Sequence, residues 1–209
     1  MKSISNIWFA GRRKAHDLAR DRKAIAATEF ALIVPLMLVM FFGTVEFSSG
    51  VAVDRKVTLI ARTLSDLTSQ ALANVDDNYL QNVFTASIAI MSPYPSTPTK
   101  AQISEIYVDS TGVAKVTWSR AATITTGATQ ATLATSSRNP GDPITIPSTL
   151  LVNQTYLILS EVSYLYTPTI GYVMAKAGVT LSDAAYTRPR QSTCIFYGGH
   201  PTGPPCPTN

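Results

Sequence analysis

A single apolar run near the start of the chain, residues 24–45, constrains the fold most. The run reads AIAATEFALIVPLMLVMFFGTV and contains one charged residue, Glu29. A helix over these residues extends roughly 33 Å, which matches a hydrocarbon core of about 30 Å. We therefore predict a transmembrane helix over residues 24–45, between a basic leader over residues 1–23 and a domain over residues 46–209.

The leader carries the positive charge that gives the whole chain its net charge of +4. Lys and Arg concentrate on the cytoplasmic side of membrane helices, so the leader is predicted to be cytoplasmic and residues 46–209 to lie outside. The basic character is local and is explained by topology and by anionic lipid headgroups, which argues against a nucleic-acid partner. The leader's basic residues are Lys2, Arg12, Arg13, Lys14, Arg20, Arg22 and Lys23, against Asp17 and Asp21.

Helical spacing continues beyond the apolar run. From Phe47 to Val75 apolar residues recur every three or four positions, which predicts one long helix from about residue 24 to the low seventies. We expect this face to pack on the domain's own sheet, and Asn74, Asp76 and Asp77 to mark the helix end. A second short helix is predicted over residues 78–91, before three prolines that exclude helix, so that residues 46–92 are mainly helical.

The hydrophobic period changes to two over residues 101–187, which are predicted to be mainly β. A hairpin is indicated by apolar alternation on both sides of the turn at residues 109–112, and residues 156–166 form the clearest strand. Residues 121–147 read as a long loop with one short strand, and residues 179–186 as a weaker strand. About 160 residues outside the membrane can bury a core, so we expect an α+β domain with roughly four antiparallel strands.

The sequence contains no recognisable catalytic motif. The two histidines, His16 and His200, lie in the leader and in the Cys/Pro/Gly tail over residues 188–209, and no Walker loop or dinucleotide-binding glycine pattern is present. We expect no enzyme activity, cofactor, metal or small-molecule substrate. Cys194 and Cys206 lie on the predicted external side, where a disulfide is favoured over a metal site that would include His200.

Two parts of the sequence carry a family resemblance. Residues 20–35, RDRKAIAATEFALIVP, followed by FGTVEF at residues 42–47, resemble the signature of the TadE and TadG-like proteins of bacterial tight-adherence pilus systems. Residues 161–168, EVSYLYTP, and the RPR motif at residues 188–190 resemble the end of that family's exterior domain. The resemblance implies a minor pilin or pseudopilin, single-pass in the bacterial inner membrane, whose partners are membrane lipid, other pilins and inner-membrane assembly components.

The resemblance also implies roles for residues of the membrane helix. A prepilin peptidase would cut between Ala24 and Ile25, which leaves Glu29 as the fifth residue of the processed chain. The ammonium group freed at Ile25 of a neighbouring subunit could then pair with Glu29 within the membrane, where an unpaired carboxylate costs roughly 2.5–3.5 kcal/mol near the helix centre.

Plainer interpretations of these residues stay open. Glu29 could sit at the level of the cytoplasmic headgroups, and Pro35 could kink the membrane helix without a dedicated role in assembly. The alternative function is a secreted or membrane-tethered extracytoplasmic binding protein unrelated to pili. In the secreted case the first 50 residues would be a signal peptide, removed near Gly50 or Val51.

Overall fold

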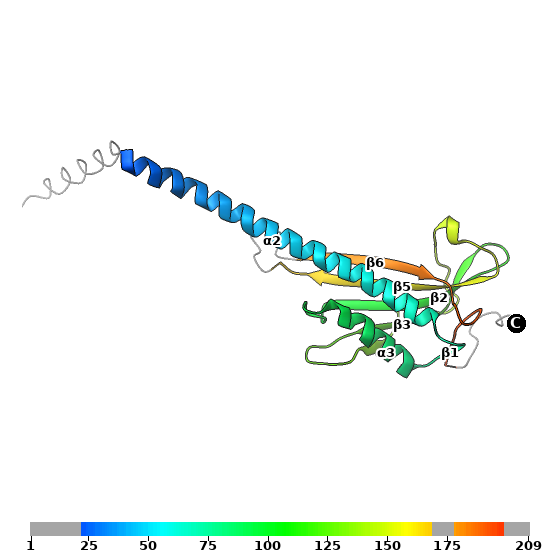
Figure 1. The fold of residues 1–209 in the computed structure, drawn as a ribbon. Coiled ribbons are helices and arrows are strands. Elements are labelled where there is room, and N and C mark those ends of the chain that lie inside the picture. The colour runs from blue at the N-terminus through cyan, green and yellow to red at the C-terminus, as the bar shows by residue number, and fades with distance from the viewer. Residues whose placement is uncertain (1–21, 169–177, 199–209) are drawn as a thin grey trace, which may run out of the picture. The chain divides into compact units, whose positions relative to one another are not determined.

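A computed structural model describes residues 22–168 and 178–198 of the chain, with side chains from residue 25 onward. The chain divides into two units, Met1–Ser48 and Ser49–Asn209. Helix α2, Arg22–Ser69, begins in the first unit and ends in the second. The predicted long helix is therefore confirmed, although it ends a few residues earlier than the sequence suggested (Figure 1).

The second unit is built on a five-stranded antiparallel sheet with the order β4-β3-β2-β5-β6 (Figure 1). The α+β fold class is confirmed, and β4 extends the expected four strands to five by pairing three residues with the end of β3. A separate parallel pair joins β1 to β7. The bounds are β1 Asn74–Val75, α3 Asp77–Ile88, the 3₁₀ helix η1 Ala89–Met91, β2 Thr99–Val108, β3 Ala114–Thr123, β4 Thr132–Ala134, the 3₁₀ helix η2 Ser148–Leu150, β5 Thr155–Tyr166, β6 Val179–Thr187 and β7 Phe196–Tyr197.

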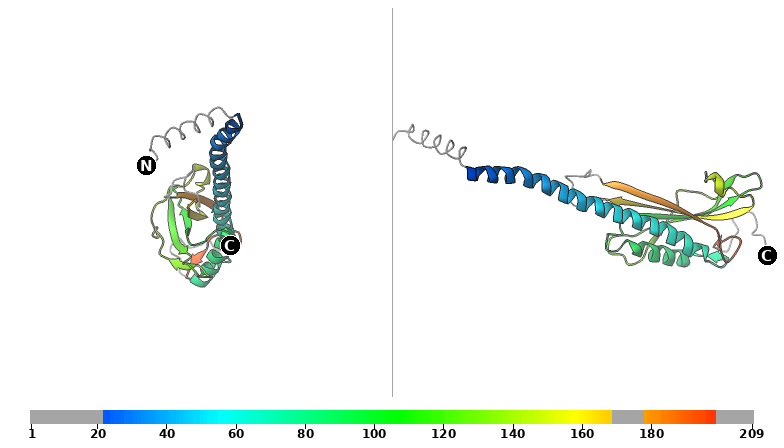
Figure 2. Two further views of the ribbon diagram at one scale, coloured as in Figure 1. Left: turned by 90° about the vertical axis from the view of Figure 1, so that its left-hand side faces the viewer. Right: turned by 45° about the horizontal axis from the view of Figure 1, so that its top comes forward.

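Residues 49–69 of α2 and helix α3 pack on the same face of the sheet and form the main core (Figure 2). Val57, Ile60 and Leu64 are fully buried, as the helical spacing predicted. The predicted packing face of the helix began at Phe47, but Phe47 and Val51 are exposed. The packed part of this face therefore begins later than predicted. The remaining members of this core include Val53, Ala61, Leu80, Phe84, Ile88, Ile103, Trp118, Ala122, Ile158, Val162, Tyr164 and Tyr166.

The opposite face of the sheet is covered at one end only. Leu157 and Leu159 of β5 point there, with Ile106 and Val108 of β2, and pack under the loop that carries Ile146. The strand β5 is thus buried on both faces, which explains why apolar residues follow one another along it without strict alternation.

Two aspartates stabilise local backbone structure, one in a hairpin turn and one at the start of a helix. Asp109 accepts hydrogen bonds from Thr111 Oγ1 at 2.6 Å and from the backbone N–H of Val113 at 2.9 Å in the β2–β3 hairpin, and these bonds lower its pKa to about 2. Asp76 accepts from the N–H of Tyr79 at 2.8 Å and is the N-cap of α3. The expectation that Asp76 helps to end the long helix was therefore wrong, since its side chain starts the next one.

Candidate assembly helix and tail-anchoring site

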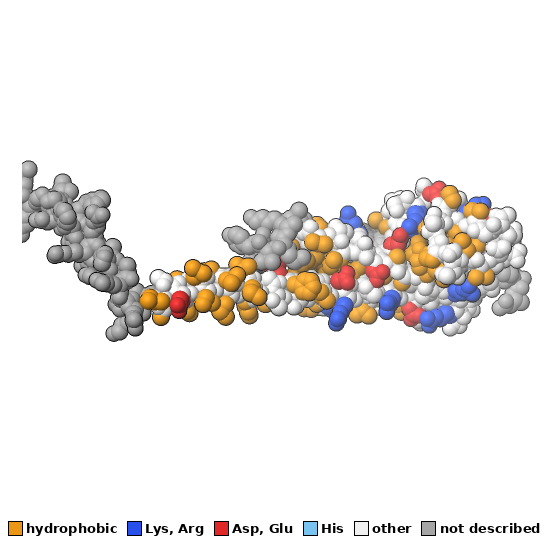
Figure 3. Space-filling view, turned by 90° about the horizontal axis from the view of Figure 1, so that it is seen from above, with side chains coloured by type: hydrophobic (Ala, Val, Ile, Leu, Met, Phe, Trp, Pro, Cys, Tyr) orange, Lys and Arg blue, Asp and Glu red, His pale blue; other side chains and the backbone are white. Residues whose placement is uncertain are grey.

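The apolar part of α2 meets the requirements for a membrane span. Within the described residues, one helix, Ile25–Ser69, contains a window long and apolar enough to cross a membrane, with a mean hydropathy of 2.3 and no buried residue in that window. Apolar side chains dominate the surface of this part of the helix in Figure 3. Leu32 and Phe30 are among the most exposed, at 79% and 68%. Such a surface suits lipid or neighbouring apolar helices rather than water.

The predicted processing and pairing residues lie close together on this helix. The bond between Ala24 and Ile25 lies in the first turn of α2, and Glu29 follows one turn later with an exposed side chain. Thr28 Oγ1 donates to the carbonyl oxygen of Ile25 at 2.8 Å. None of the four ion pairs among the described residues includes Glu29. Its carboxylate therefore has no charged partner within the described part of the chain, and pairing with another subunit stays a prediction.

Pro35 lies inside α2, and the helix continues through it without a break in secondary structure. Proline has no N–H, so the carbonyl of Ala31 has no i+4 donor in the helix. Further along the helix, Thr44 Oγ1 donates to the carbonyl of Met40, four residues earlier, at 2.9 Å. A kink at Pro35 stays a prediction.

The second unit contains a buried carboxyl group that sequence reasoning missed. Glu105 is only 2% exposed and lies on the helix-facing side of β2, like Ile103 two residues before it. Opposite it, the β2–β3 register shifts between Glu105 and Ile106, which makes Thr117 an extra residue on β3. Thr117 Oγ1 reaches Glu105 Oε2 at 2.7 Å and the Glu105 carbonyl at 3.1 Å.

Glu105 and Trp118 together hold one residue of the C-terminal segment. Glu105 Oε1 accepts from the backbone N–H of Ile195 at 2.6 Å, and Trp118 Nε1 donates to the Ile195 carbonyl at 2.7 Å. Desolvation by burial raises the pKa of Glu105 to about 7, although the hydrogen bonds from Ile195, Thr117 and Trp118 oppose the shift. The site fixes the backbone of the segment that follows Cys194.

The same segment is held at two further points. The N–H of Phe196 donates to Ala73 O at 2.8 Å, and β7 pairs with β1. The Arg120 guanidinium lies 4.4 Å from the centre of the Tyr197 ring, and the Tyr197 hydroxyl donates to Asp77. Cys194 is itself buried. Cys206 and His200 lie outside the described residues, so the bridge between Cys194 and Cys206 stays a prediction.

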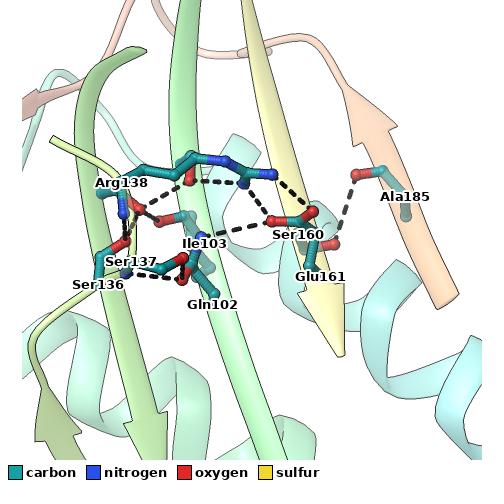
Figure 4. A network of polar contacts seen from close by, with 10 residues as sticks. Gln102, Ile103, Ser136, Ser137, Arg138, Ser160, Glu161 and Ala185 are labelled. Atoms are coloured by element: carbon teal, nitrogen blue, oxygen red, sulfur yellow. Dashed lines mark hydrogen bonds and ion pairs between the residues drawn. The ribbon is translucent and has the colours of Figure 1, made fainter. Parts of the chain in front are cut away.

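A polar network ties a loop to the outer face of the sheet (Figure 4). Arg138 Nη2 donates to Glu161 Oε1 at 2.7 Å, and Nη1 pairs with the other oxygen of the same carboxylate. Gln102 Oε1 accepts from Ser137 N–H at 3.3 Å, and its Nε2 donates to Glu161. These residues line a hollow of about 650 Å³. The carboxylate is already engaged by a guanidinium, so the network fixes the loop.

The described residues also give no framework for metal binding. No group of three or more His, Cys, Asp and Glu side chains among them could hold a metal ion. His16, like His200, lies outside the described residues.

Comparison with known proteins gives one match. No curated protein and no solved structure matches the chain. A family model described as TadE-like protein matches residues 24–64. The matched residues include Ala24, Ile25, Glu29, Pro35 and the part of α2 that enters the core of the second unit. The match confirms, over residues 24–64, the resemblance of this chain to the TadE and TadG-like proteins of pilus assembly.

Proposed function

We propose that the chain is a membrane-anchored minor pilin-like or pseudopilin-like subunit that takes part in assembling a tight-adherence (Flp-type) pilus. The observation that carries the proposal is the TadE-like match over residues 24–64, which includes the apolar part of α2, residues 24–45, with its single acid Glu29. The subunit has a structural role, with other pilins, inner-membrane assembly components and lipid as its partners, and no catalytic one.

The proposed orientation follows from charge. The basic leader stays in the cytoplasm and α2 crosses the bacterial inner membrane once. The second unit, called the exterior unit in this proposal, lies in the periplasm or beyond it. The surplus of Lys and Arg before the span supports this direction. The alternative of a signal peptide removed near Gly50 would cut α2 within its helical length, shortly before the buried residues Val53 and Val57.

Assembly is proposed to depend on Glu29. Cleavage after Ala24 would convert the amide nitrogen of Ile25 into an α-ammonium group, about one helical turn from Glu29 in sequence. In neighbouring subunits these two charges can pair in the low-dielectric membrane, where each alone would be costly. The apolar surface from Phe30 to Phe42 provides the rest of the contact between helices.

The substitution Glu29→Gln tests this mechanism. It should leave membrane insertion and the exterior unit intact, because an amide is less costly in lipid than a carboxylate, but it should reduce association with assembly partners. Co-purification after cross-linking, at equal membrane abundance, measures this association. Thr28→Val is the matched control at the neighbouring position, and Glu29→Asp should restore much of the association. Unchanged association of the Glu29→Gln protein would refute the pairing.

A further inference from the structure

Strand β6 is a long edge of the five-stranded sheet. It pairs through nine residues with β5 on one side and borders the sheet on the other (Figure 1). The opposite border, β4, has only three residues. Thr180, Ser182 and Ala184 of β6 are exposed. An edge of this length offers a row of backbone donors and acceptors to an added strand.

The side chains around β6 show which backbone groups point outward. In an antiparallel strand the N–H and C=O of each residue point to one side, and this side alternates along the chain. Ser160 Oγ of β5 lies 3.4 Å from the carbonyl oxygen of Ala185, so the backbone groups of Ala185 point toward β5. The N–H of Ala184 instead donates to the carboxylate of Asp183 at 2.8 Å.

The alternation therefore places the backbone groups of four residues on the outer side of the edge. No other described strand or helix forms a backbone hydrogen bond with these groups. The Asp183 carboxylate accepts from one of these donors, the N–H of Ala184. Charged side chains on edge strands hinder unwanted pairing with other chains in this way. The four residues are Thr180, Ser182, Ala184 and Tyr186.

A charged hollow lies beside the second half of this edge. It has a volume of about 580 Å³ and is lined by residues 184–187 of β6 together with Arg62, Asp66 and Arg190. Arg190 pairs with Asp66 at 2.7 Å. Arg62 is exposed and forms none of the ion pairs found among the described residues. The hollow is thus lined by two arginines and one aspartate, next to outward backbone groups that no other described strand or helix pairs.

We propose that the β6 edge and this hollow form a docking site for an extended, acidic segment of another protein. The segment would pair its backbone with Ser182, Ala184 and Tyr186 and place a carboxylate against Arg62. Backbone bonds give such β-augmentation its affinity, and side-chain contacts give its specificity. The site lies wholly within the exterior unit and goes beyond the proposed role of Glu29 in the membrane. A failure of either proposal therefore leaves the other untouched.

A synthetic peptide probe tests the proposal on the full-length protein in detergent micelles. The probe is an acetylated and amidated peptide of sequence Thr-Val-Thr-Asp-Thr-Val-Thr, labelled with a fluorophore, and binding is followed by fluorescence anisotropy. We expect saturable binding that weakens at least tenfold when Asp is replaced by Lys. Two versions of the peptide, each methylated on one of the two alternating sets of backbone nitrogens, test the pairing. The version methylated on the nitrogens that face the edge should bind at least tenfold more weakly.

Variants of the protein locate the site. Ala184→Pro removes an outward N–H but no bond to β5, so it should block binding while the fold is retained, as circular dichroism can verify. Arg62→Glu should weaken binding at least tenfold, whereas Arg55→Glu, two turns earlier on α2, should not. Asp183→Ala should strengthen binding severalfold, because it frees the N–H of Ala184 and removes a negative charge.

Four results would overturn the proposal. The first is the absence of saturable binding at millimolar peptide. The second is equal binding by the unmethylated peptide and by both alternately methylated versions, which would exclude backbone pairing. The third is equal weakening by Arg62→Glu and Arg55→Glu, which would show only non-specific attraction. Concentration-dependent association of the protein with itself through β6, abolished by Ala184→Pro, would assign the edge to a second copy and would also refute the partner proposed here.

Discussion

The substitution Glu105→Gln should stabilise the second unit at neutral and alkaline pH. Glu105 is buried against Ile195 and Trp118, and its pKa in the folded state is about 7, compared with 4.5 for an unperturbed glutamate. The folded state therefore binds a proton more tightly than the unfolded state. The contribution of Glu105 to stability is greatest below pH 4.5, falls as the pH rises toward 7, and is constant above that range.

The size of the effect follows from this difference in pKa, which corresponds to about 3 kcal/mol. Glutamine has no charge to bury and can keep the important contacts. Its carbonyl oxygen can accept from the N–H of Ile195, and its amide can donate to Thr117 Oγ1, which in turn donates to the carbonyl of residue 105. We expect a gain of up to about 3 kcal/mol at pH 8 and little difference at pH 4.

Urea unfolding of the full-length protein in micelles measures this gain, with the fluorescence of buried Trp118 as the probe. Asp54→Asn, which removes an exposed carboxylate from α2, is the control and should show no comparable pH-dependent gain. The pKa of Tyr156, raised to about 12 by burial and by the charge on Glu105, should fall in the Glu105→Gln protein. Equal stability of the two proteins at pH 8, or a wild-type stability that rises between pH 5 and 7, would refute the reasoning.

Three further outcomes are expected. A reporter active only outside the cytoplasm should be active when fused after the last residue and inactive when fused before the first; the opposite result would reverse the proposed topology. Thiol labelling of the exported, non-reduced protein should find neither Cys194 nor Cys206 free, whereas full labelling of both would exclude the bridge. In urea unfolding, Leu64→Ala should cost about 2–5 kcal/mol, because Leu64 is fully buried between α2 and the sheet, while Leu59→Ala at an exposed position of α2 should cost far less; equal costs would contradict the packing described.

Elements with a sustained hydrophobic period could be predicted from the sequence. The spacing through Val57, Ile60 and Leu64 predicted the buried face of α2, because packing on one sheet requires apolar residues every three or four positions; the predicted helix end was a few residues too late. The β2–β3 hairpin followed from turn residues between alternating runs. The strand β4 could be expected only as one short strand within a long loop, because three residues carry too little pattern to fix its position.

The tail-anchoring site depends on contacts that sequence spacing does not reveal. Glu105 and Ile195 are far apart in the chain, and their contact needs the strand register and the bulge at Thr117. One signal was available, since Glu105 shares the strand face of Ile103 and would be buried if that face met the helices. Asp76 was misjudged because the same residue type can follow one helix or cap the next.

Mass spectrometry of the mature N-terminal peptide, from membrane and sheared-surface fractions, tests the central proposal most directly. The proposed pilin-like processing predicts that the peptide begins at Ile25, which leaves Glu29 at the fifth position. A peptide beginning at Gly50 or Val51 would show secretion after signal-peptide removal, and one beginning at Met1 would show an uncleaved anchor. Either of these two results would contradict assembly through an ammonium group at Ile25.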